Sequence, residues 1–138
     1  MTEKLPIGVV IVTHGLFGQE LLNTAQDIVG RQEMAAALSV MPETGGETLC
    51  QLIGQAMDEM RPSDLGTLFL VDMLGGTPCN TSLLKTRDLT AEIITGVNLY
   101  MLLSSFTHRH SMDLKTLAGR QRPFTHLRIG RRRQIDPA

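Results

Sequence analysis

Two turns in the sequence hold side chains that could act together in a chemical reaction. His14 follows the apolar run 7–13, and Asp72 follows a second apolar run at residues 67–71. A carboxylate that accepts a hydrogen bond from one imidazole nitrogen fixes the tautomer and leaves the lone pair of the other nitrogen free to attack. The pair would therefore form a histidine nucleophile if the fold brings the two side chains together.

The residues around these turns add groups that could hold an anion. Gly75, Gly76 and Thr77 precede a proline, at the expected start of a helix. Backbone N–H groups and the positive end of the helix dipole favour anions at such a position. Because glycine has no side chain, Gly15 would let the backbone of the first turn approach the same anion closely. With the Thr77 hydroxyl, these groups could bind the oxygens of a phosphoryl group.

Each of these signals also has a purely structural explanation. A histidine at a strand end is commonly a structural residue, and an aspartate there often caps the next helix. Neither turn has the pattern of a P-loop or of a dinucleotide fingerprint, so nucleotide binding is not expected. One histidine and one carboxylate are too few ligands for a metal site. We expect neither a metal nor a cofactor.

The apolar pattern predicts the elements that position the two turns. Four continuous apolar runs are typical of strands covered on both faces, and they span residues 7–13, 35–41, 67–71 and 91–95. Helical periods follow them over residues 16–29, 47–60, 78–86 and 98–106. This alternation predicts parallel βαβ units and hence a doubly wound α/β fold with a mainly parallel sheet.

The predicted order of the strands decides where a ligand would bind. In an open sheet of this type, ligands bind beyond the carboxyl ends of the strands, where the strand order reverses. In the order 2-1-3-4 the first and third strands are neighbours. We therefore expect His14 and Asp72 to emerge at the same edge of the sheet, within reach of each other.

Length and composition favour one soluble globular domain over residues 1–138. The chain is 42% hydrophobic and 20% charged, which fits a globular protein rather than a disordered one. Only 4% of the residues are aromatic, which argues against a platform for stacking nucleic-acid bases. No long apolar run or signal-peptide pattern is present in the sequence, so a cytoplasmic location is expected.

The C-terminal segment 109–138 differs in charge from the rest of the chain. It carries eight Lys and Arg against two acidic residues, whereas residues 1–108 carry five against twelve. A short helix at 112–118 and an edge strand at 124–129 are possible there. We expect this segment to be solvated or to contact a second subunit, and not to bind nucleic acid, although clustered Lys and Arg can release counterions from phosphates. The core is predicted at about 6–108.

Three motifs in order resemble the mannose-family enzyme IIA domain of the bacterial phosphoenolpyruvate-dependent sugar phosphotransferase system. They lie at residues 8–25, 70–80 and 96–102, and the resemblance covers about residues 6–108. Thr77 stands where the family commonly has serine, which keeps the hydroxyl. Cys79 replaces a residue that is often aromatic, so the rim of the site is expected to differ.

The resemblance implies a phosphohistidine carrier. By it, His14 accepts a phosphoryl group from the small carrier protein HPr and passes it to an enzyme IIB, with Asp72 as the hydrogen-bond partner of the ring. Contact with the membrane would be only indirect, through enzymes IIC and IID. The family forms homodimers by exchanging a C-terminal edge strand, although the basic residues 124–133 depart from the family pattern at that place.

Several other functions stay open at this point. The leading alternative is a regulatory protein that uses the same phosphorylation as a signal and has no role in transport. Delivery of the phosphoryl group to a dihydroxyacetone kinase, or a flavodoxin-like binder of a small ligand, would use the same fold. The sequence does not identify the sugar, because other components of such a system bind it.

Overall fold

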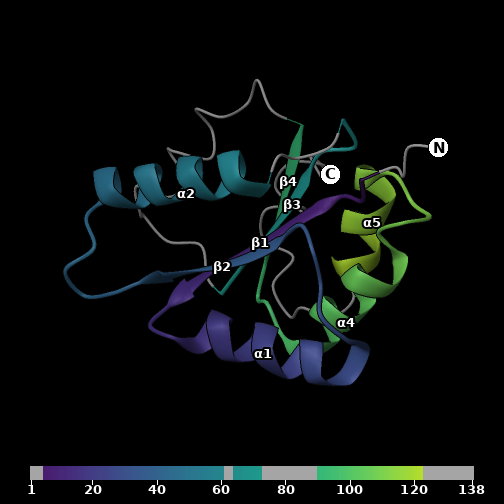
Figure 1. Cartoon of the computed structure of the whole chain (residues 1–138), viewed down its shortest axis with the longest axis horizontal. Coiled ribbons are helices and arrows are strands. Elements are labelled where there is room, and N and C mark those ends of the chain that lie inside the picture. The colour runs from purple at the N-terminus through teal and green to yellow at the C-terminus, as the bar shows by residue number, and fades with distance from the viewer. Residues whose placement is uncertain (1–4, 61–63, 73–89, 123–138) are drawn as a thin grey trace, which may run out of the picture.

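A four-stranded parallel sheet forms the centre of the structure (Figure 1). The computed structural model describes residues 5–60, 64–72 and 90–122. The strands are β1 (Gly8–His14), β2 (Ala35–Val40), β3 (Thr67–Val71) and β4 (Ala91–Thr95). Their order is β2-β1-β3-β4, which confirms the predicted order 2-1-3-4.

Strand β1 is central and is buried on both faces until it reaches His14. Ile7 and residues 9–13 are at most 3% exposed and Gly8 is buried, as expected for a β-branched run in the middle of a parallel sheet. β1 pairs with β2 on one side and with β3 on the other. In this register Val12 lies opposite Val71, so the next residues along both strands reach the carboxyl edge together.

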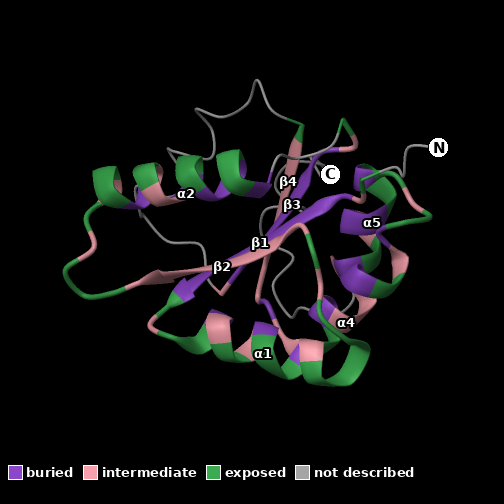
Figure 2. Cartoon of the chain, viewed as in Figure 1, coloured by how far each residue is buried: buried purple, intermediate pink, exposed green. Residues whose placement is uncertain are grey.

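Helices cover both faces of the sheet, as Figure 1 shows. They are α1 (Phe17–Val29), α2 (Gly46–Met60), α4 (Leu99–His108) and α5 (Leu114–Gln121). Because side chains alternate along a strand, Val9 and Ile11 pack toward α1 and α4, while Val10 and Val12 pack toward α2. Figure 2 shows buried positions on the helix sides that face the sheet.

The predicted elements agree with the observed ones within a few residues. The four strands and the helices at 16–29, 47–60 and 98–106 are confirmed. The short helix expected at 112–118 is found at 114–121, where Asp113 caps it by accepting from the Thr116 N–H group at 2.8 Å. The helix predicted at 78–86 and the edge strand predicted at 124–129 lie outside the described residues. No described helix is long and apolar enough to span a bilayer.

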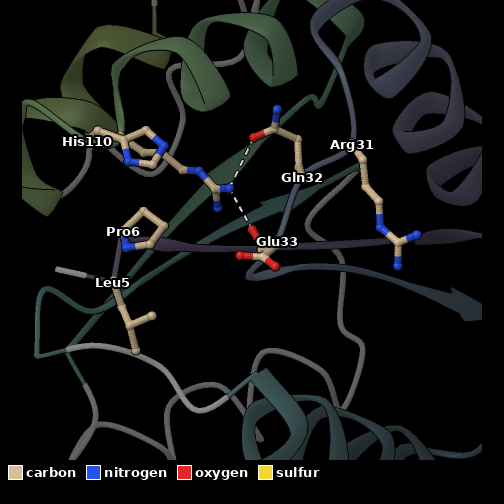
Figure 3. Close-up of a pocket in the computed structure, with 7 residues that line it drawn as sticks. Leu5, Pro6, Arg31, Gln32, Glu33 and His110 are labelled. Carbon is tan, nitrogen blue, oxygen red and sulfur yellow. Dashed lines mark hydrogen bonds between the residues drawn. The ribbon is translucent and has the colours of Figure 1, made fainter. Parts of the chain in front are cut away.

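Arg109, the first residue of the basic segment 109–138, departs from the expectation that this segment is solvated or contacts a second subunit; residues 123–138 lie outside the described residues. This residue is only 2% exposed and reaches the amino ends of the first two strands. Its Nη1 donates to the carbonyl oxygens of Ile7 at 3.1 Å and Met34 at 3.0 Å. Its Nη2 donates to the Glu33 carbonyl oxygen at 2.5 Å and to Gln32 Oε1 at 3.1 Å (Figure 3).

This buried guanidinium joins segments that are distant in the sequence. Met34 has a positive φ of 55°, which is unusual for a residue with a side chain, and its carbonyl oxygen also accepts from the Val9 N–H group at 3.0 Å. The Arg109 guanidinium lies over the Phe106 ring at 5.1 Å from the centroid. Burial lowers the pKa of Arg109 to about 10, against a weaker opposing effect of the Glu33 charge, so it is still cationic at neutral pH.

We predict that Arg109→Met destabilises the domain by about 2 kcal/mol or more, because buried carbonyl oxygens lose their charged donor. Urea denaturation of the variant measures this loss. The matched control is Arg31→Met, since Arg31 is exposed and lies beside the same loop. Its free energy of unfolding is expected to change by less than about 0.5 kcal/mol. Equal stability of the two variants would contradict the role given to Arg109.

Candidate functional site

His14 and Asp72 meet at the carboxyl edge of the sheet. The ring Nδ1 of His14 lies 2.9 Å from Oδ2 of Asp72. The same carboxylate oxygen accepts a second hydrogen bond, from the backbone N–H group of His14, at 2.8 Å. The pair that the sequence predicted is therefore brought together, and the carboxylate holds both the main chain and the ring of one residue.

The pairing of β1 and β3 creates this contact. The N–H group of Asp72 donates to the Val12 carbonyl oxygen at 3.3 Å, which continues the ladder between the two strands by one residue. The side chain of His14 is 57% exposed and that of Asp72 is 21% exposed. The carboxylate is thus partly shielded beneath an accessible ring.

The hydrogen bonds define the chemistry of the imidazole. Because an ionised carboxylate only accepts hydrogen bonds, the neutral ring of His14 carries its proton on Nδ1. Nε2, on the opposite side of the ring, then keeps its lone pair. A positive charge that develops on the ring as Nε2 attacks is stabilised by the carboxylate of Asp72. The arrangement suits a histidine nucleophile.

Gly15 fixes the direction of the chain just after His14. Its φ is +57°, a left-handed conformation that residues with a side chain rarely adopt. Its N–H group donates to the Val40 carbonyl oxygen at 2.9 Å, which ties the turn to the end of β2. A Cβ at this position would meet no described atom within 4 Å, so the glycine is needed for its backbone conformation rather than for space.

The three other residues predicted for the site, Gly75, Gly76 and Thr77, lie outside the described residues. Two described features were not predicted from the sequence. The first is a buried hydrogen bond at 2.6 Å, in which Thr13 Oγ1 accepts from the Gly18 N–H group. The signal in the sequence was Thr13, a hydroxyl residue close to the start of α1, where the side chain of Leu16 at the N-cap cannot accept a hydrogen bond.

The second feature is a set of exposed apolar and aromatic side chains that follow the strands at the carboxyl edge. Leu16 and Phe17 come after β1 and are 61% and 49% exposed. Met41, after β2, is 38% exposed, and Tyr100, at the start of α4, is 72% exposed. Exposed apolar side chains at one edge of a domain are typical of a surface that contacts another protein.

A cavity of about 630 Å³ lies at the opposite edge of the sheet. Its lining comes from residues that precede β1 and β2 and from the end of α4 (Figure 3): Leu5, Pro6, Arg31, Gln32, Glu33, Arg109 and His110. It is therefore separate from His14. Among the residues that the structure describes, no three His, Cys, Asp or Glu side chains are grouped so that they could hold a metal ion.

Comparisons with known proteins find relatives of this chain. Residues 8–120 match the model of a family described as the fructose IIA component of the phosphotransferase system. The mannose-specific EIIAB component of Escherichia coli strain K12 is 34% identical over 106 residues, which cover 76% of this chain and 32% of that protein. The chain thus spans about a third of the length of that relative.

Two further proteins match the chain over most of their own length. The fructose-specific EIIA component of Bacillus subtilis strain 168 is 33% identical over 112 residues, 80% of this chain and 76% of that protein. The solved structure of a mannose/sorbose-specific IIA subunit of the phosphotransferase system from Enterococcus faecalis superposes with a TM-score of 0.72 at 25% identity. That superposition covers 85% of this chain and 87% of the other.

We predict that Asp72→Asn weakens the preference of His14 for a proton on Nδ1, because the carboxylate that accepts this proton is lost. Nitrogen-15 NMR of the imidazole rings reports the tautomer directly. His110 is exposed and serves as an internal reference, since its signals should not change. If the His14 tautomer is the same in wild type and variant, the carboxylate does not control it.

Proposed function

The chain belongs to the mannose/fructose-type enzyme IIA family of the sugar phosphotransferase system, and on that premise we propose that His14 accepts a phosphoryl group from HPr and passes it to an enzyme IIB. The observation that carries this proposal is the 2.9 Å contact between Nδ1 of His14 and Asp72, beside an exposed ring. Membership of this family supports HPr and enzyme IIB as the partners, and we propose a cytoplasmic location.

The proposed reaction is a transfer between two imidazole rings. Nε2 of neutral His14 forms a bond to the phosphorus of a phosphohistidine on HPr, while the phosphorus–nitrogen bond of the donor breaks. The donor ring keeps the electron pair of that bond. The His14 ring then carries a phosphoryl group on Nε2 and a proton on Nδ1, and its positive charge is balanced by Asp72. Transfer to a histidine of enzyme IIB runs through the same geometry in reverse.

Positioning and charge stabilisation supply the catalysis in this proposal, because the donor is already activated. Asp72 orients the nucleophile, and Gly15 sets the direction of the turn that carries it. As expected from the sequence, Gly75, Gly76 and Thr77 bind the phosphoryl oxygens in this proposal. The proposal requires neither a metal nor a bound cofactor.

The apolar surface around His14 supports a protein as the phosphoryl donor. A small phosphorylated metabolite would call for buried polar and charged groups, whereas Leu16 and Phe17, which follow His14 closely in the sequence, are exposed. Side chains of this type form the dry centre of transient protein interfaces. Docking of HPr would cover them and exclude water from the ring.

We predict that His14→Ala abolishes phosphorylation of the chain by phosphoenolpyruvate, enzyme I and HPr, because the nucleophile is lost. Mass mapping of the modified peptide identifies the acceptor in the wild-type chain. His110→Ala is the matched control, since it removes an exposed histidine far from Asp72 and should leave labelling unchanged. Undiminished labelling of His14→Ala would overturn the proposal.

The docking surface predicts a separate effect on binding. Leu16→Ser should raise the KM for HPr about tenfold with little change in kcat, because a contact residue and not the nucleophile is removed. Ile28→Ser is the matched control. Ile28 is 58% exposed, similar to Leu16, but lies at the other end of α1, roughly 18 Å away along the helix axis. Equal values of KM for both variants would show that HPr does not dock on Leu16.

A further inference from the structure

The turn that carries His14 is closed by a hydrogen bond from inside the sheet. Thr13 lies on β1 directly before His14 and is completely buried. Its Oγ1 accepts from the N–H group of Gly18, the second residue of α1, at 2.6 Å. The four residues between these two positions therefore form a short loop with both ends held.

This hydrogen bond replaces the usual cap of the helix. The first N–H groups of a helix have no partner within it, and a Ser, Thr, Asp or Asn at the N-cap normally accepts from the second or third residue. Here Leu16 occupies the N-cap and makes no side-chain cap. Thr13 supplies the missing acceptor from three residues earlier, within the strand.

Gly18 makes the close approach possible. A Cβ at this position would lie 2.8 Å from Thr13 Oγ1 and 3.0 Å from a methyl carbon of Ile11. Since real Cβ contacts are not that short, any larger residue would push the start of α1 away from β1. The glycine and the buried hydroxyl together fix how the helix sits on the strand that ends in His14.

We propose that Thr13 is a positioning residue for phosphoryl transfer: its hydroxyl caps α1 from within β1 and thereby holds the turn that presents the His14 ring. The inference rests on the proposed function of His14. It also explains the residue at position 16. Because Thr13 provides the cap, this position needs no polar cap and carries an exposed leucine two residues after His14.

The test replaces the hydroxyl without changing the size of the side chain. Thr13→Val should lower kcat for transfer from phosphorylated HPr by about tenfold to a hundredfold, while the KM for HPr stays near the wild-type value. Thr13→Ser keeps the hydroxyl and should restore most of the rate. Thr67→Val is the matched control, because Thr67 is also completely buried on a strand and its hydroxyl has no hydrogen-bond partner among the described residues.

The result is decided by comparing these variants. The proposal is overturned if kcat of Thr13→Val falls no further than that of Thr67→Val, or if Thr13→Ser is as slow as Thr13→Val. If even the wild-type chain accepts no phosphoryl group, the proposed function fails. Nitrogen-15 NMR then still tests Thr13, because Thr13→Val should weaken the Nδ1–H tautomer of His14. An unchanged tautomer in that variant would refute the positioning role.

Discussion

The carboxylate of Asp72 is the interaction on which the site depends. One oxygen, Oδ2, accepts from both the backbone N–H group and the ring Nδ1 of His14. The first hydrogen bond fixes the position of the His14 backbone, and the second fixes the orientation and tautomer of the ring. Because Asp72 is partly shielded while His14 is accessible, the charge that stabilises the ring is kept beneath the surface that a partner would meet.

The rest of the carboxyl edge supports the same residue from other directions. Gly15 ties the turn to β2, and Thr13 ties it to the start of α1. His14 is therefore held between β3 on one side and β2 with α1 on the other. Such preorganisation matters for the proposed transfer, since small displacements of the attacking atom reduce the rate strongly.

The amino and carboxyl edges of the sheet differ in burial and in the contacts that their residues make. At the amino edge, Arg109 is buried and holds the segments before β1 and β2 through carbonyl oxygens. The hydrogen bonds of this buried cation offset part of the solvation that it loses. At the carboxyl edge, His14 and several apolar side chains are exposed. The contacts of Arg109 that stabilise the domain are thus separated in space from the proposed reaction at His14. Substitutions at one edge need not change the properties of the other edge.

The sequence by itself determined the strand order, most element bounds and the pairing of His14 with Asp72. It could do so because continuous apolar runs and helical periods are local signals, and because parallel βαβ units bring alternate turns to one edge. It did not reveal the burial of Arg109, which the charge pattern placed in a basic segment, nor the cap that Thr13 gives to α1. The Arg109 contact spans 102 residues and has no signal in the local sequence. The Thr13 contact spans only 5 residues, and its one signal is a hydroxyl residue close to a helix start. Only the tertiary structure decided them, because burial and hydrogen bonding are set by what packs against a residue and not by its type.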